Sequence, residues 1–172
     1  MQNDREPDAL IVRGGDPGMP PREAFATEVI LAQLMLPSDA NTSGNVHGGT
    51  LMKIADTAGG IAASRHARKR VVTVVVDSMT FEQPAYVGDL VTFHGRVTWV
   101  GRTSIETEVR IEAENVVQGS TRRISTAFFV YVALDAEGNT SAVPPLALSG
   151  ADALAKWDAA ERRREHRIAR RA

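Results

Sequence analysis

The chain has 172 residues, of which 43% are hydrophobic and 24% charged, and its formal net charge is −1. These values predict one globular domain with short tails, exclude two catalytic domains side by side, and give no overall field that would attract nucleic acid. Because cysteine is absent and no apolar run reaches the roughly 18 residues that a membrane span needs, we expect a cytoplasmic protein without disulfides, thiolate metal sites or a membrane span.

The N-terminal part of the chain predicts an arm, a strand and a helix. Residues 1–22 are rich in glycine, proline and scattered charges, which favours a mobile N-terminal arm. The apolar run from Phe25 to Met35 predicts a first strand, and a turn-forming segment follows it. Residues 49–66 carry apolar residues at helical spacing and basic residues at their end, so they predict the main helix.

Four strands are expected after this helix. Residues 71–81 are apolar on both faces, which predicts a strand covered on both sides. Residues 90–99 and 105–112 alternate apolar and polar side chains around a turn, and they predict an antiparallel hairpin. Residues 123–134 predict a last strand in the sheet centre. The order of elements indicates an α+β domain over 23–147, with one helix packed on a single, largely antiparallel sheet.

Residues 148–172 are predicted to form a helical, basic C-terminal tail. The last twelve residues carry six basic and two acidic side chains. We interpret this arginine run either as a solvated helix end or as a group that reaches the phosphate of a ligand on a neighbouring subunit.

The helix entrance is the first candidate site, because it sets Asn45 and His47 beside Gly48 and Gly49. Free N–H groups at a helix N-terminus form a positive site for an anion or a developing oxyanion, and glycine lets a ligand approach closely. The same residues also fit a plain turn in which Asn45 caps the helix. The pattern alone leaves both interpretations open.

Asp56 lies seven residues after Gly49, about two helical turns, and therefore on the same face of the helix. A carboxylate among alanine, isoleucine and glycine is a candidate base, but it also belongs to a polar stripe typical of a solvent-exposed face. The glycines at positions 59 and 60 each cost a helix about 1 kcal/mol relative to alanine, which indicates close packing or room for a ligand. No carboxylate partner follows His66 or His94 at metal-ligand spacing, so no metal site is predicted.

The segment from Leu36 to Asp56, LPSDANTSGNVHGGTLMKIAD, resembles the hotdog-fold acyl-CoA thioesterases of the cytosolic (brain-type) acyl-CoA hydrolase family, including its bacterial single-domain, broad-specificity members. Residues 70–81, 87–89, 101–104 and 127–132 match in the order of that family. The resemblance implies one long central helix wrapped by a curved antiparallel sheet of about five strands. It also implies hydrolysis of acyl-CoA to a free fatty acid and coenzyme A without a cofactor, in a homodimer with active sites at the dimer interface, commonly assembled as a trimer of dimers.

The resemblance also implies roles for single residues. In the tandem-domain relatives of the family, the catalytic pair is an asparagine of the NVHGG-type segment of one hotdog domain and an aspartate of the helix of the other, which correspond to Asn45 and Asp56. Some bacterial single-domain relatives carry aspartate at the first position. Asp56 would act as general base or nucleophile, Asn45 would orient water or the carbonyl, and the N–H groups of Gly48 and Gly49 would stabilise the oxyanion. Coenzyme A is expected to contact eight further residues: His47, Arg65, Arg68, Thr73, Val74, Arg102, Thr103 and Ser104.

Two other functions fit the same fold. A hotdog enoyl-CoA hydratase or dehydratase would use His47 with Asp56, although the surrounding motif disagrees with it. A non-catalytic acyl-CoA or nucleotide-binding protein would leave Asp56 as a solvent-facing residue. Release of thiol from acyl-CoA separates hydrolysis from both alternatives.

Overall fold

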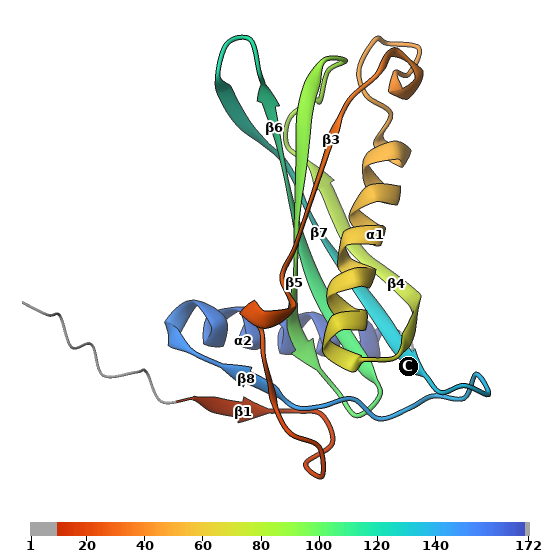
Figure 1. The fold of residues 1–172 in the computed structure, drawn as a ribbon, viewed down its shortest axis with the longest axis vertical. Helices are drawn as coiled ribbons and strands as arrows, with labels where there is room; N and C mark the ends of the chain where they lie inside the picture. The colour runs from red at the N-terminus through yellow and green to blue at the C-terminus, as the bar shows by residue number, and fades with distance from the viewer. Residues whose placement is uncertain (1–9, 171–172) are drawn as a thin grey trace, which may run out of the picture.

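The computed structural model describes residues 10–170. A five-stranded antiparallel sheet, in the strand order β3-β5-β6-β7-β4, forms the centre of the molecule, and the long helix α1 (Gly48–Ala67) lies along one of its faces (Figure 1). The second helix, α2 (Gly150–Ala169), lies near one end of this sheet (Figure 1). The strands of the large sheet are β3 (Val29–Leu34), β4 (Arg70–Phe81), β5 (Asp89–Val100), β6 (Ser104–Asn115) and β7 (Ser120–Leu134). A small sheet contains β1 (Ile11–Arg13), β8 (Leu146–Leu148) and β2 (Arg22–Glu23), and two short 3-10 helices are η1 (Phe25–Thr27) and η2 (Pro37–Asp39).

The two helices cover opposite faces of the large sheet. On β6, Thr107 lies against Gly59 of α1, whereas the neighbouring Glu106 and Glu108 pair with basic side chains of α2. Since successive side chains of a strand point to opposite faces, this alternation places one helix on each side. The apolar character of both faces of residues 127–132 follows from this arrangement.

Small side chains bring α1 close to the sheet. Ala55, Ala58 and Ala62 are fully buried, and they form the face of α1 that packs on the strands. A Cβ at Gly95 of β5 would lie only 2.9 Å from the carbonyl oxygen of Ala58, so this strand also needs a glycine at the contact. The helix that the 3.6-residue period predicts over 49–66 is confirmed, as are the antiparallel hairpin and the five-stranded sheet.

Two of the expected strands differ from the prediction. The first is shorter than 25–35, because Phe25–Thr27 form a 3-10 turn in which the Thr27 hydroxyl donates to the carbonyl oxygen of Ala24 at 2.8 Å. The last strand, β7, lies inside the sheet between β6 and β4, while β6 occupies the centre.

The prediction that residues 71–81 are covered on both sides is wrong within one chain. β4 is an edge strand, and its residues Val72, Val74 and Val76 are between 41% and 49% exposed. Two bulges interrupt its pairing with β7, where Val74 and Asp77 are the extra residues. A long apolar edge of this kind is typical of a strand that pairs with another chain.

The prediction of a mobile N-terminal arm is wrong for the part of the arm that the structure describes. Ile11–Arg13 pair antiparallel with β8, and Arg22–Glu23 pair parallel with the same strand. Arg22 donates from Nη1 to the carbonyl oxygens of Arg65 and His66, at 3.2 and 2.5 Å, near the end of α1. Composition does not register backbone pairing of this kind, and residues 1–9 of the arm lie outside the described residues.

The predicted tail over 148–172 contains α2, but its arginines are not all solvated. Arg163 Nη2 lies 2.6 Å from Oε1 of Glu106, and Arg167 Nη1 lies 2.9 Å from Oε2 of the same carboxylate, which is fully buried. The rings of Trp99 and Trp157 also meet at 5.9 Å between centroids. The tail is therefore anchored to the sheet. No helix within residues 10–170 has the length and apolar character needed to cross a membrane.

Candidate active site

An open hollow with a volume of about 510 Å³ lies beside the C-terminal half of α1, where this helix meets β4 and β7. Four of the residues predicted for the site line this hollow. They are Asp56, Arg65, Arg68 and Thr73. The polar and charged residues that line it include Asp56, Ser64, Arg65, Arg68, Thr73 and Tyr131.

The Asp56 carboxylate is half-buried and held by two hydroxyl groups. Thr73 donates from Oγ1 to Oδ1 of Asp56 at 2.8 Å, and the phenol of Tyr131 lies 3.1 Å from the same oxygen. Thr73 and Tyr131 are direct partners across β4 and β7, so neighbouring strands present both hydroxyls to one acceptor. Within the described residues Oδ2 of Asp56 has no hydrogen-bond donor. Asp56 is therefore a half-buried carboxylate held by two hydrogen bonds, and not simply one residue of a solvent-exposed polar stripe.

Tyr131 is 1% exposed, and it is a residue that the sequence analysis missed. Burial raises the pKa of the Tyr131 phenol well above its ordinary value, and the negative charge of Asp56 raises this pKa further. The phenol therefore stays protonated and acts as a donor. Its position in an apolar strand gives no sign of this contact in the sequence.

The paired glycines of α1 have different neighbours. A Cβ at Gly59 would lie 2.6 Å from both Oγ1 of Thr107 and the hydroxyl oxygen of Tyr131, so close packing requires glycine there. Gly60 lines the hollow, and a Cβ there would lie at an ordinary 3.5 Å from Cε1 of Tyr131. The two explanations that the sequence leaves open thus apply to one glycine each.

The helix entrance differs from the simplest prediction. His47, and not Asn45, is the N-cap of α1, and its Nδ1 accepts a hydrogen bond from the Gly49 N–H at 3.0 Å. The Gly49 N–H is therefore occupied, although the resemblance implies that it stabilises an oxyanion. In the described part of the chain, the Gly48 N–H has no hydrogen-bond partner. This group remains available to an anion.

The loop before the helix is organised by Asn41. Its Oδ1 accepts from the backbone N–H groups of Ser43 at 2.9 Å and of Asn45 at 3.2 Å. Asn45 itself forms an isolated bridge with Tyr86. Asn41 is not among the predicted site residues, although it lies in the turn-forming segment SDANTSGN.

One chain does not bring the helix entrance to the carboxylate. Seven residues of α-helix separate Gly49 from Asp56, which corresponds to about 10 Å along the axis. The carbonyl group of one thioester cannot contact both the helix entrance and the Asp56 carboxylate of the same chain. A site that uses both needs a helix entrance from another chain.

The remaining residues predicted to contact coenzyme A are divided between regions. Val74 and Ser104 line a second hollow, of about 430 Å³, on the α2 face of the sheet. Arg102 and Thr103 form the β5–β6 turn, where their carbonyl oxygens accept hydrogen bonds from the N–H groups of Val143 and Ala133. His47 is exposed at the helix entrance.

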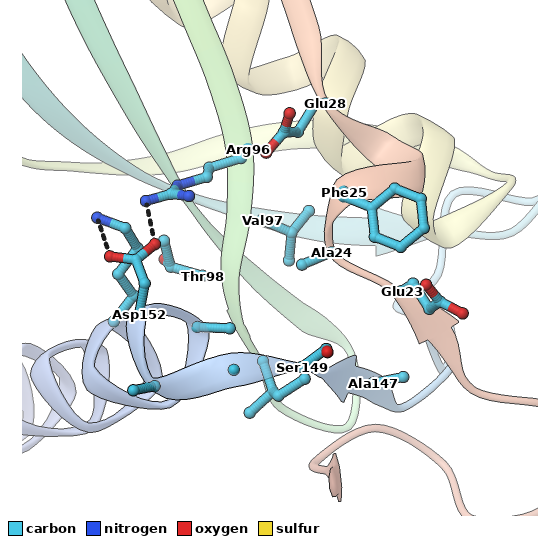
Figure 2. Close-up of a pocket in the computed structure, with 15 residues that line it drawn as sticks. Glu23, Ala24, Phe25, Glu28, Arg96, Val97, Thr98, Ala147, Ser149 and Asp152 are labelled. Carbon is cyan, nitrogen blue, oxygen red and sulfur yellow. Dashed lines mark hydrogen bonds and ion pairs between the residues drawn. The ribbon is translucent and has the colours of Figure 1, made fainter. Parts of the chain in front are cut away.

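A third hollow, of about 310 Å³, lies where β5 meets the small sheet and the start of α2 (Figure 2). Asp152 crosses its wall, 3.3 Å from Nη2 of Arg96 and 3.7 Å from Nζ of Lys156. None of the residues predicted for the site lines it. Within residues 10–170 no group of three or more histidine, aspartate and glutamate side chains is placed to hold a metal ion.

Comparison with known proteins identifies the family. The family model described as Thioesterase superfamily matches residues 43–120. The Escherichia coli protein named acyl-CoA thioester hydrolase YciA is 38% identical over 120 residues, which cover 68% of this chain and 91% of that protein. The human cytosolic acyl coenzyme A thioester hydrolase is 38% identical over 128 residues, covering 73% of this chain. This chain spans about a third of that relative, because the match covers 34% of it.

Solved structures agree with this match. The acyl-CoA hydrolase of Staphylococcus aureus, solved with butyryl coenzyme A and coenzyme A, superposes with a TM-score of 0.82 at 30% identity, covering 88% of this chain and 93% of that one. A hexameric acyl-CoA thioesterase superposes with a TM-score of 0.86 at 31% identity, covering 90% and 99%.

Three further structures of the Staphylococcus aureus hydrolase carry single alanine substitutions of an aspartate, an asparagine and a threonine. In that protein the asparagine precedes the aspartate by 15 positions and the threonine follows it by 17. The same intervals separate Asn41, Asp56 and Thr73 here.

From the family match, the identity to full-length bacterial relatives and the shared fold, we conclude that the chain belongs to the thioesterase superfamily, among the acyl-CoA thioester hydrolases.

Proposed function

We propose that this protein hydrolyses acyl-CoA thioesters to a fatty acid and coenzyme A. The observation that carries the proposal is the Asp56 carboxylate, held by Thr73 and Tyr131 in a hollow that also contains Arg65 and Arg68. A carboxylate supplies a base or a nucleophile, and guanidinium groups suit the phosphates of coenzyme A. The names of the human and Escherichia coli relatives support the same substrate class.

The chemistry needs few groups. Asp56 takes a proton from water, whose oxygen attacks the thioester carbon, or Asp56 attacks directly and a mixed anhydride is then hydrolysed. The tetrahedral intermediate places negative charge on the former carbonyl oxygen, where N–H groups stabilise it. Its collapse expels the coenzyme A thiolate, a good leaving group that needs no strong acid. The proposed reaction therefore uses no metal or cofactor.

The oxyanion donors come from a second copy of the chain in this proposal. The distance of about 10 Å between the helix entrance and Asp56 within one chain is the main reason. The exposed apolar edge of β4 supports pairing of two chains through this strand, which would bring Thr73 close to the partner subunit. Gly48 of the partner subunit is the better supported donor, because His47 occupies the N–H of Gly49. The hexameric structural neighbour supports further assembly into a trimer of dimers.

We also propose that Asn41, and not Asn45, supplies the side-chain amide that orients water or the thioester carbonyl. The resemblance assigned this role to Asn45. The shared intervals of 15 and 17 residues support Asn41 as the counterpart of the substituted asparagine in the Staphylococcus aureus hydrolase. Substitution of each asparagine by alanine, followed by kinetics, separates the two. Asn41→Ala should lower kcat more than Asn45→Ala does, and the reverse order would restore the original assignment.

The proposed activity is tested by following thiol release from acyl-CoA esters, from acetyl to palmitoyl, with a disulfide dye. Asp56→Ala and Asp56→Asn should lower kcat by about 10²–10⁴-fold, the usual contribution of a general base, while the fold stays intact. Asp158→Asn, a change at an exposed aspartate of α2, is the matched control. Near-normal turnover of both Asp56 variants would remove the mechanism, and binding without thiol release by the wild type would remove the activity. A cytoplasmic location is part of the same proposal, in keeping with the name of the human relative.

A further inference from the structure

The phenol of Tyr131 joins α1 to the sheet at the residue that carries the reaction. Its hydroxyl oxygen lies 2.9 Å from the carbonyl oxygen of Asp56 and 3.1 Å from Oδ1 of the same residue. One hydroxyl therefore contacts both the backbone and the side chain of Asp56. Such a contact fixes the side-chain torsions of the carboxylate as well as its place on the helix.

The position of this hydroxyl is itself closely determined. The ring of Tyr131 packs against Phe129 with 6.3 Å between centroids, and Thr107 and Gly59 close the space around its oxygen. Glycine is a poor helix former, yet position 59 has no room for a larger residue because the phenol and the Thr107 hydroxyl occupy that space. A rigid donor results, in contrast to Thr73, which lies on the exposed edge strand.

Two donors on one oxygen leave the other oxygen for chemistry. Thr73 and Tyr131 both bond to Oδ1 of Asp56, so Oδ2 is the oxygen available to water or to the thioester. Burial and the neighbouring negative charge keep the Tyr131 phenol protonated, which excludes it as a base and preserves it as a donor.

We propose that Tyr131 is a positioning residue for thioester hydrolysis, whose phenol locks the Asp56 carboxylate with Oδ2 free to react. This inference rests on the proposed function. A purely structural tyrosine would contribute through its ring, which Tyr131→Phe retains. The hydroxyl, in contrast, contacts both the backbone and the carboxylate of Asp56, with Thr107 beside it on the neighbouring strand.

The test compares Tyr131→Phe with the wild-type protein in thiol-release assays that measure kcat and KM separately. The variant should lose about tenfold to a hundredfold in kcat, as expected when a reacting group is misplaced, while KM changes less than twofold. Phe128→Leu, which alters packing on the opposite face of β7 beside Arg163, is the control for lost stability and should keep both kcat and KM.

A second pair of variants tests whether Tyr131 acts through Asp56. In an Asp56→Asn background, Tyr131→Phe should cause no further loss of the residual rate. An unchanged kcat in Tyr131→Phe, or equal losses in both backgrounds, would overturn the inference while leaving the proposed hydrolysis intact. A wild-type protein that releases no thiol from any acyl-CoA would overturn the proposed function, and with it this role.

Discussion

The contact between α1 and the sheet at Gly59 allows a sharp test of the packing, because Gly60 beside it provides a matched control. In Gly59→Ala the new methyl group would lie 2.6 Å from Oγ1 of Thr107 and from the hydroxyl oxygen of Tyr131. Ordinary contacts lie near 3.5–4 Å, so the overlap is about 1 Å with each of two buried side chains. In Gly60→Ala the nearest atom is Cε1 of Tyr131 at 3.5 Å, and the methyl group fits.

The magnitudes follow from two opposing effects. Alanine in place of glycine stabilises a helix by about 1 kcal/mol, and this gain applies at both positions. Overpacking a buried contact costs about 1–3 kcal/mol, and the two simultaneous overlaps at Gly59 place its cost near the upper end. Gly59→Ala should therefore lower the free energy of unfolding by about 2 kcal/mol, while Gly60→Ala should raise it by up to about 1 kcal/mol.

Urea unfolding and thermal melts, run at one protein concentration because assembly contributes to apparent stability, measure the difference. A gap of about 3 kcal/mol corresponds to about 6–12 °C in Tm for a chain of this size. If Gly59→Ala proves as stable as Gly60→Ala, then α1 does not approach β6 and β7 as closely as described. The placement of Tyr131 against Asp56 would then fail as well.

Three further predictions concern the tail, the buried histidine and the end of α1. Glu106→Ala leaves Arg163 without its carboxylate partner and should lower the free energy of unfolding by about 3 kcal/mol in urea titrations. The control, Arg162→Ala at an exposed position, should change it by less than about 0.5 kcal/mol. Similar effects of both substitutions would contradict the anchoring of the tail. Burial, and to a lesser degree Arg22, lowers the pKa of His66, so the unfolded chain binds more protons below pH about 6.5 and stability should fall as the pH drops from 8 to 5. His66→Leu should flatten this urea-midpoint profile and the exposed His166→Leu should not; equal slopes would refute the assignment. Arg68 has a left-handed backbone with φ 53°, so Arg68→Gly should relieve about 1 kcal/mol of strain and raise Tm while raising KM for acyl-CoA several-fold. A lower Tm with an unchanged KM would count against both roles of that residue.

Periodicity was enough to predict the elements whose two faces differ. The helix carries its alanines at 55, 58 and 62 on one side, and the β5–β6 hairpin alternates polar and apolar side chains, so both could be placed from the sequence. β4 could not, because three exposed valines on an edge look the same as three valines under another layer. The missing information is the partner of the strand, which a single chain does not encode in its apolar pattern.

The candidate site was predictable only where a residue type is unusual in its setting. Asp56 stands out in an alanine-rich helix, whereas Tyr131 is one aromatic residue among several in an apolar strand. Its role depends on being opposite Thr73 across two strands that are far apart in sequence. Arg163 and Arg167 were interpreted from the local charge run, since nothing nearby in the sequence indicates that Glu106 is buried beneath them.

The two bulges of β4 restrict which strands can extend the large sheet. The extra residues at Val74 and Asp77 bend this edge strand and interrupt the regular alternation of its backbone hydrogen-bond donors and acceptors. A flat, regular strand from an unrelated protein would lose its register with this edge within a few residues, so the bulges disfavour edge-to-edge aggregation at this apolar border. In a dimer paired through β4, a two-fold axis would bring the same two bulges of the second copy to the contact, so both edges would share one irregular spacing.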